Sequence, residues 1–146
     1  MKTKDHLISY TLISGLFLLL DQVLKYLART NSDFTFYLWK PILGWEYFAN
    51  PGIAFSIPIP NWLIILITPI ILILFIGLIL KSKKKTKIFY FSLFLIIAGA
   101  ISNFIDRILF SATIDYLRIL TGIINLADVM IVVGTGIILW REWKIK

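Results

Sequence analysis

The most informative stretch of this chain is residues 81–110, KSKKKTKIFYFSLFLIIAGAISNFIDRILF. Its basic tract at 81–87 leads into an apolar run from Ile88 to Phe110, which matches the roughly 20 residues with which a helix crosses a bilayer. Three more apolar runs, at about residues 7–28, 62–80 and 123–140, have similar lengths. We therefore predict an all-α membrane protein in which one domain, residues 1–146, contains four transmembrane helices.

Composition independently indicates the membrane class. Hydrophobic residues make up 59% of the sequence and the mean hydropathy is +0.88. Soluble domains contain about 45–50% apolar residues. A chain of 146 residues cannot bury this much apolar surface in its own core, so lipid must cover the excess.

The positions of the charges predict the orientation of these helices. Ten of the fifteen Lys and Arg residues lie in three tracts, at residues 2–4, 81–87 and 141–146, and each tract adjoins an apolar run. Lys and Arg next to a span are retained on the cytoplasmic side of the membrane. Both termini and the 81–87 loop are therefore expected in the cytoplasm, which agrees with an even number of spans. The same distribution argues against nucleic-acid binding, because no soluble domain presents a basic face.

Two segments are then expected outside the cytoplasm. Residues 29–61 are rich in aromatic side chains and are interrupted by Pro and Gly, which indicates a small β-rich sheet or hairpin at the membrane interface. Residues 111–122 are fewer and are expected to form an external loop that carries Asp115 and Arg118.

The residue types that the chain lacks limit its chemistry. There is no cysteine, and the one histidine, His6, lies in the N-terminal tail. This composition excludes thiolate catalysis and Cys-ligated metals, and it disfavours a zinc site or triad built on histidine. We expect no metal and no cofactor, so any hydrolytic chemistry must use carboxylates, hydroxyls or lysine.

Carboxylates occur where a membrane helix should be apolar. Asp21, Asp106 and Asp128 lie in or at the ends of predicted spans, where a carboxylate costs about 2.5–3.5 kcal/mol on insertion scales. With the predicted orientation, all three lie toward the outer ends of their helices. The polar residues beside them are Asn103, Arg107 and Asn125. One polar site near the outer leaflet accounts for this common depth.

Most of these residues also have a structural interpretation. Asp21 and Lys25 are four positions apart and can pair on one helix face. Asp106 and Arg107 can form an ion pair at the interface. The remaining structural interpretations are interhelical hydrogen bonds for Asn103 and Asn125 and an ordinary loop position for Asp115. Asp128 is harder to explain in this way, because no basic residue lies within one helical turn of it.

Two carboxylates in one site suggest a hydrolase. Like charges at short range cannot both ionise cheaply, so such a pair holds one proton between its members. The ionised member can deprotonate a water while the other donates to a scissile carbonyl. A proton relay through Asp21, Asp106 and Asp128 in a transporter uses the same residue type, although the inner halves of the predicted spans are nearly all apolar. A non-enzymatic scaffold is a third interpretation, which leaves the common depth of the acids unexplained.

Five motifs, taken in order, are similar to those of the lipoprotein signal peptidases, also called the signal peptidase II family. Asp21-Gln22-x-x-Lys25 resembles D-Q-x-x-K, and residues 50–55, NPGIAF, match N-x-G-x-A-F. Residues 99–107, GAISNFIDR, are close to G-A-x-G-N-x-x-D-R. Residues 114–117, IDYL, are similar to V-D-F-I, and residues 125–128, NLAD, match N-x-A-D. The resemblance covers nearly the whole chain.

This resemblance implies an aspartic endopeptidase whose catalytic pair is Asp115 and Asp128, although depth alone would rank Asp106 ahead of Asp115. It implies removal of the signal peptide from diacylglyceryl-modified prolipoproteins, with the cut just before the lipidated cysteine, in the bacterial cytoplasmic (inner) membrane. The partners are then lipid-modified signal peptides and membrane phospholipid, and we expect a monomer. The matched positions that should support the site or bind substrate are Asp21, Lys25, Asn50, Gly52, Asn103, Asp106, Arg107 and Asn125.

The chain departs from the family pattern at a few positions. Ser102 stands where the pattern has Gly, Tyr116 where it has Phe, and Ile124 where Phe is common. Ala98 replaces another Gly, which predicts slightly wider helix packing around residues 98–102. The stretch between Asp115 and Asp128 is also shorter than the resemblance suggests, which could alter how substrate is admitted.

Overall fold

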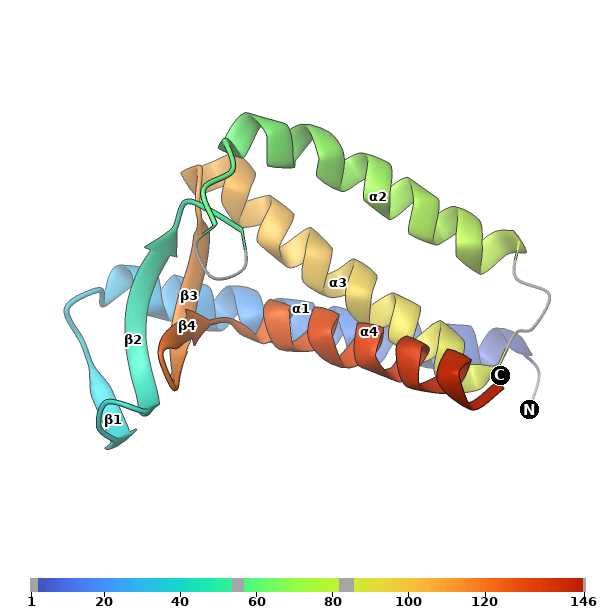
Figure 1. The fold of residues 1–146 in the computed structure, drawn as a ribbon, viewed down its shortest axis with the longest axis horizontal. Helices are drawn as coiled ribbons and strands as arrows, with labels where there is room; N and C mark the ends of the chain where they lie inside the picture. The colour runs from blue at the N-terminus through green and yellow to red at the C-terminus, as the bar shows by residue number, and fades with distance from the viewer. Residues whose placement is uncertain (1–2, 54–56, 82–85, 146) are drawn as a thin grey trace.

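The computed structural model describes residues 3–53, 57–81 and 86–145. Its helices are α1 (Thr3–Thr30), α2 (Asn61–Lys81), α3 (Lys87–Phe110) and α4 (Leu126–Ile145). Strands β1 (Phe36–Trp39) and β2 (Leu43–Asn50) lie between α1 and α2, and strands β3 (Thr113–Ile119) and β4 (Gly122–Ile124) lie between α3 and α4. The helices form an elongated bundle with the strands at one end, while α1 begins and α4 finishes at the other end (Figure 1).

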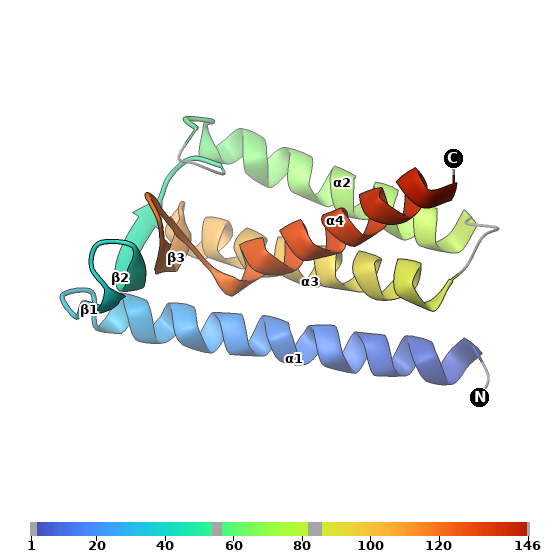
Figure 2. The ribbon, with the colours of Figure 1, turned by 60° about the horizontal axis from the view of Figure 1, so that its bottom comes forward.

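Helix α3 is the centre of the bundle. It contacts α1, α2 and α4, and Figure 2 shows it running between α1 and α2. The α3–α4 contact depends on small residues: a Cβ added at Gly99 would lie 2.6 Å from the carbonyl oxygen of Ala127, and one added at Gly134 would lie 2.7 Å from that of Ser92. Small residues allow backbones to approach closely in membrane helix pairs. Helices α3 and α4 are therefore packed closely along their lengths, from the start of α4 to Gly134.

The prediction of four helices agrees with the structure, whereas their capacity to span a membrane is supported for two of them. Among the described residues, α1 and α3 have both the length and the hydropathy of a membrane span. Helix α2 contributes a shorter apolar stretch, Asn61–Gly77. Lipid-facing helices are also indicated by large exposed apolar side chains, such as Leu12, Leu16 and Ile73, each more than 60% exposed. These features fit a membrane protein.

The predicted β-rich segment within residues 29–61 is present, but it is only half of the sheet. The four strands are ordered β1-β2-β3-β4 and each neighbouring pair is antiparallel. The expectation of a loop at 111–122 was therefore wrong, because residues 113–119 pair with β2 along its length. Sheet formation there depends on a partner more than 60 residues away in sequence, which local patterns do not reveal. Asp115 consequently lies opposite Phe48 in a strand.

The fourth helix begins later than the predicted residue 123. Residues 122–124 form β4, and Asn125 precedes the first helical residue, Leu126. The Asn125 side-chain oxygen accepts a hydrogen bond from the Asp128 backbone N–H at 2.8 Å, and the Asp128 carboxylate accepts one from the Asn125 N–H at 3.4 Å. This reciprocal arrangement is a capping box, which satisfies backbone donors at a helix start. Asp128 therefore has a structural role that the sequence interpretation did not include.

Candidate active site

One asparagine joins the two predicted catalytic aspartates. The Asn125 side chain donates to the Asp115 carboxylate at 2.7 Å and also caps the helix turn that carries Asp128. Asp115 comes from β3 and Asp128 from the first turn of α4, so the sheet and the helix meet at this residue. Chain segments that are separate in sequence thus bring two carboxylates to one place.

Asp115 is completely enclosed by the fold. Its side chain is 1% exposed, and its second carboxylate oxygen accepts a hydrogen bond from Asn50 at the end of β2, at 3.1 Å. Burial, together with the nearby charge of Asp128, raises the pKa of Asp115 to about 7. The hydrogen bonds from Asn50 and Asn125 act in the opposite direction, since they favour the ionised form. A carboxyl group with such a pKa can exchange its proton near neutral pH.

Asp128 is half-buried and receives a second amide donor. Asn103 on α3 donates to it from its side-chain nitrogen at 2.8 Å, while the Asn103 oxygen accepts from Lys25 at 2.9 Å and from Asn125 at 3.1 Å. The amide orientation of Asn103 is therefore determined by its neighbours: its oxygen faces an ammonium group, so its nitrogen must face the carboxylate. The interhelical hydrogen bond suggested for Asn103 and Asn125 is present.

Lys25 forms a buried cluster with two further aspartates. Its ammonium lies 2.8 Å from Asp21 and 2.8 Å from Asp106, and the three side chains are at most 2% exposed. The predicted pairing of Asp21 with Lys25 is thus observed. The suggested ion pair of Asp106 with Arg107 was wrong, because Asp106 turns instead to Lys25 and to the backbone N–H of Ile114 at 3.1 Å. This cluster joins α1 and α3 to β3.

Three residues of this cluster were missed as site residues in the sequence interpretation. The Ser102 hydroxyl donates to Asp21 at 2.6 Å, and the Tyr116 hydroxyl donates to the other oxygen of Asp21 at 2.8 Å. Gln22 donates to Ser102 and to Asp106, at 2.9 and 3.2 Å. The available signal was the departure of positions 102 and 116 from the family pattern, since both substitutions introduce a hydroxyl group.

Arg107 holds the segment that follows β2. Its guanidinium donates to the carbonyl oxygen of Gly52, and the side chain of Asn61 donates to the carbonyl oxygen of Arg107 at 3.1 Å. The Gly52 N–H in turn donates to the Asn50 side chain at 3.0 Å. Asn50 is thereby positioned with its amide nitrogen toward Asp115. Gly52 and Arg107 were both predicted as supporting residues. They hold Asn50 in place and do not themselves bond the carboxylates of Asp115 and Asp128.

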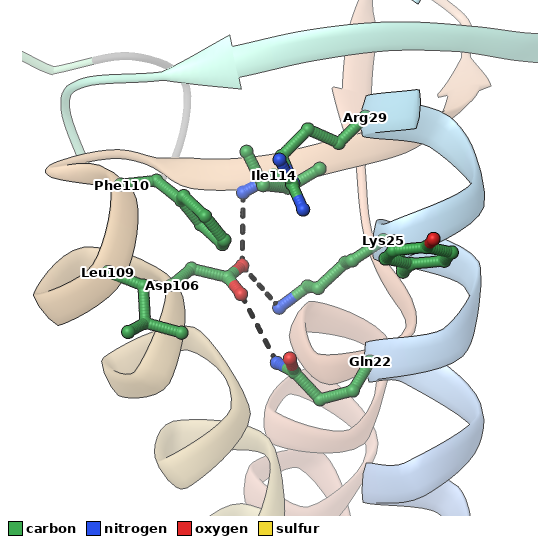
Figure 3. A pocket seen from close by; sticks show the side chains of 8 residues that line it. Gln22, Lys25, Arg29, Asp106, Leu109, Phe110 and Ile114 are labelled. Atoms are coloured by element: carbon green, nitrogen blue, oxygen red, sulfur yellow. Dashed lines mark hydrogen bonds and ion pairs between the residues drawn. The ribbon is translucent and has the colours of Figure 1, made fainter. Parts of the chain in front are cut away.

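A small cavity lies on another side of the Lys25 cluster. It has a volume of about 90 Å³ and opens between α1 and α3, with Gln22, Lys25, Asp106 and Arg29 among its lining residues (Figure 3). Arg29 and Phe110 also line this cavity, and the Arg29 guanidinium lies 4.6 Å from the centre of the Phe110 ring. Asp115 and Asp128 do not line this cavity. Across the described ranges, no group of three His, Cys, Asp or Glu side chains is arranged to hold a metal.

Fold comparison defines the class of protein first. Two solved bacterial membrane enzymes, both determined by the in meso method, are similar to this chain, with TM-scores of 0.86 and 0.80 and 27% sequence identity in each case. The first similarity covers 93% of this chain and 88% of the other, and the second covers 91% of each. The fold is that of a bacterial membrane enzyme.

Sequence comparison then identifies the family. The model of the family described as signal peptidase (SPase) II matches residues 13–144. The lipoprotein signal peptidase of Bartonella tribocorum is 37% identical over 147 residues, covering 94% of this chain and 86% of its own length. That of Listeria monocytogenes serotype 4a is 33% identical over 138 residues, covering 89% and 90%. The chain belongs to the signal peptidase II family, and it is a protease that removes signal peptides from prolipoproteins.

The buried cluster predicts a large stability effect at Lys25. Lys25→Met leaves two buried carboxylates without their cation, and breaking a buried ion pair in this way typically costs about 3–5 kcal/mol. We expect a marked fall in the midpoint of thermal unfolding in detergent, with partial recovery in the Lys25→Met/Asp106→Asn double variant. The matched control is Lys40→Met, because Lys40 is exposed and lies over the Tyr37 ring. Equal midpoints for the two single variants would contradict the structural role of this cluster.

Proposed function

We propose that Asp115 and Asp128 are the catalytic pair of this signal peptidase. The observation that carries the proposal is that both carboxylates accept hydrogen bonds from Asn125: Asp115 from its side-chain nitrogen at 2.7 Å, and Asp128 from its backbone N–H at 3.4 Å. Within the described residues, Asp21 and Asp106 are both ion-paired with Lys25, whereas Asp115 and Asp128 have only neutral amide donors. Neutral donors orient the carboxylates and leave their proton chemistry available.

The pair acts on a peptide bond by general acid–base catalysis. One proton is shared between the two carboxyl groups, because two adjacent carboxylates cannot both ionise cheaply. The ionised carboxylate removes a proton from a water molecule as that water attacks the scissile carbonyl carbon, and the protonated carboxyl donates to the carbonyl oxygen. The tetrahedral intermediate then collapses: the C–N bond breaks, the leaving nitrogen takes a proton from one carboxyl group, and a hydroxyl of the intermediate returns its proton to the other as the carbonyl re-forms. One acid and one carboxylate are restored.

We further propose that the substrate is a diacylglyceryl-modified prolipoprotein that is cut just before its lipidated cysteine. Asp115 lies in β3, which follows α3, and Asp128 lies in the first turn of α4; the apolar surfaces of these helices can accommodate acyl chains. The remaining supporting residues hold this geometry: Asn103 and Asn125 orient the carboxylates, while Asn50, Gly52 and Arg107 order the segment after β2. Membrane phospholipid is the surrounding partner.

The catalytic assignment predicts equal loss in single and double variants. Asp115→Asn and Asp128→Asn nearly preserve side-chain shape but remove acid–base function, so each should lower cleavage by at least about 10³-fold, and the double variant should lower it no further. The assay is gel-shift cleavage of a diacylglyceryl-modified prolipoprotein by purified protein in detergent, with mass spectrometry to identify the new N-terminal residue. Asp33→Asn, at an exposed aspartate, is the control and should cleave normally.

Two outcomes would contradict this assignment. Retained cleavage by folded Asp115→Asn, combined with loss in Asp106→Asn, would move the chemistry to the Lys25 cluster. A new N-terminus other than the lipidated cysteine would overturn the proposed cleavage position while leaving the catalytic pair intact.

The pKa of Asp115 predicts the alkaline side of the activity profile. Because its pKa is raised to about 7, Asp115 keeps the proton of the pair below that pH and loses it above. Cleavage should therefore fall as pH rises through about 7. In Asn50→Ala the ionised form of Asp115 loses a hydrogen bond, which raises the pKa of Asp115 further. The fall of activity at high pH, the alkaline limb of the profile, should therefore move to higher pH. An activity that stays constant from about pH 6 to 9 would contradict a protonated Asp115 in the active form.

We propose that all four helices span the bacterial inner membrane, with both termini and the 81–87 tract in the cytoplasm. Support comes from the three basic tracts and from the position of the sheet, at the opposite end of the bundle from the start of α1 and the last turns of α4 (Figure 1). The catalytic pair then lies near the outer leaflet. We also propose a monomer, since one chain supplies every site residue; light scattering of the detergent-solubilised protein measures its mass.

The absence of natural cysteines makes the topology directly testable. Single cysteines at Asp33 and Thr121, next to the sheet, should react with a membrane-impermeant maleimide in intact cells whose outer surface is accessible. A cysteine at Lys144 should react only after the membrane is opened. Labelling of the Lys144→Cys variant in intact cells, at the rate of the other two, would contradict the proposed orientation.

A further inference from the structure

The Tyr116 hydroxyl connects two helices that are far apart in sequence. It donates to the Asp21 carboxylate on α1 at 2.8 Å and accepts from the backbone N–H of Leu126 at 3.1 Å. Leu126 is the first residue of α4. A free N–H at a helix start has no partner within its own helix, so Tyr116 supplies that partner from outside.

This connection ends one residue from the asparagine of the active site. Asn125 directly precedes Leu126 and bonds Asp115 through its side chain and Asp128 through its cap. Asp115 is also the residue before Tyr116 in β3. The Tyr116 hydroxyl therefore lies at the point where β3 and α4 must be held at the correct separation for the two carboxylates.

The direction of both hydrogen bonds is determined by the charges around Asp21. Lys25 at 2.8 Å and the Ser102 hydroxyl at 2.6 Å stabilise Asp21 as an acceptor, so the Tyr116 proton must point toward it. The hydroxyl oxygen is then free to accept from Leu126. Burial and the charge of Asp21 raise the pKa of Tyr116, which keeps this proton in place throughout the working pH range.

The Tyr116 ring is held independently of its hydroxyl. The side chain is completely buried against Ala28 and Ile114, and the ring lies 5.0 Å from that of Trp45, measured between centroids. Loss of the hydroxyl therefore leaves a packed phenyl ring in the same place. The Tyr116→Phe variant therefore removes the two hydrogen bonds of the hydroxyl and keeps the packing of the ring.

We propose that Tyr116 is a positioning residue for catalysis, whose hydroxyl ties the start of α4 to Asp21 on α1 and thereby sets Asn125 between the two aspartates. This inference rests on the proposed catalytic pair, Asp115 and Asp128. It also gives a role to two of the departures noted in the sequence: the hydroxyls of Ser102 and Tyr116 bond the two oxygens of the same Asp21 carboxylate.

The first test compares Tyr116→Phe with Tyr47→Phe in the cleavage assay. Tyr47 packs against the same cluster as Tyr116, but its hydroxyl makes no hydrogen bond within the described ranges, so its loss should leave kcat unchanged. For Tyr116→Phe we expect kcat to fall about tenfold, the size typical of a hydrogen bond to a charged group, with KM within about twofold. The alkaline limb should also move to higher pH, because a less ordered Asn125 bonds Asp115 more weakly.

A second pair of variants tests the same link from the helix side. Leu126→Pro removes the N–H that donates to Tyr116, and proline is tolerated at the first position of a helix. Leu126→Ala loses the same side-chain packing but keeps the N–H. We expect kcat of Leu126→Pro to lie about tenfold below that of Leu126→Ala, with no further loss when Tyr116→Phe is added.

These outcomes distinguish failure of this inference from failure of the catalytic assignment. Wild-type kcat and an unmoved alkaline limb in folded Tyr116→Phe would overturn the positioning role while Asp115→Asn remained inactive. A fall in thermal stability with no change in kcat or in the limb would assign Tyr116 to stability alone and would also overturn it. If Tyr116→Phe does not fold, equal kcat values for Leu126→Pro and Leu126→Ala would overturn it. Cleavage by Asp115→Asn would instead refute the catalytic pair.

Discussion

The structure depends most on one buried ammonium group, that of Lys25, between Asp21 and Asp106. All three side chains are at most 2% exposed, and each Lys–Asp distance is 2.8 Å. In a medium of low dielectric constant an unpaired charge is very unfavourable, so these groups must stay together once the helices pack. The cluster reaches β3 through the Ile114 N–H and α4 through Tyr116. It therefore sets the relative positions of three helices and the sheet.

Neutral amides extend this arrangement to the proposed catalytic pair, Asp115 and Asp128. Asn103 accepts from Lys25 and donates to Asp128, and Asn125 connects Asp128 with Asp115. An amide accepts a hydrogen bond at its oxygen and donates one to a carboxylate at its nitrogen, so it orients the carboxylate without adding a charge, which a lysine or arginine cannot do. The pKa of Asp115 can therefore remain near 7 although a lysine is a few side chains away. The four aspartates therefore fall into two groups: Asp21 and Asp106 are paired with a lysine, whereas Asp115 and Asp128, the proposed catalytic pair, are bonded by amides.

The sheet shows where sequence interpretation reaches its limit. The aromatic segment before α2 was expected to contain strands, but the partner strand β3 was expected to be a loop. Its seven residues, TIDYLRI, form a strand because β2 lies beside them in the folded protein. The same event buries Asp115, which an isolated loop would leave in water, and this burial is the main cause of its raised pKa. The raised pKa of Asp115 thus results from the pairing of two strands that are far apart in sequence.

Hydrophobic run length and aromatic content were sufficient to predict four helices and strands between the first two of them, because these depend on local transfer free energies and propensities. The spacing of Asp21 and Lys25 was sufficient to predict their pairing. Local sequence could not distinguish Lys25 from Arg107 as the partner of Asp106, or reveal that Ser102 and Tyr116 converge on Asp21. Those choices arise only when α1, α3 and β3 are in contact, since each buried polar atom takes the partner that packing places within about 3 Å.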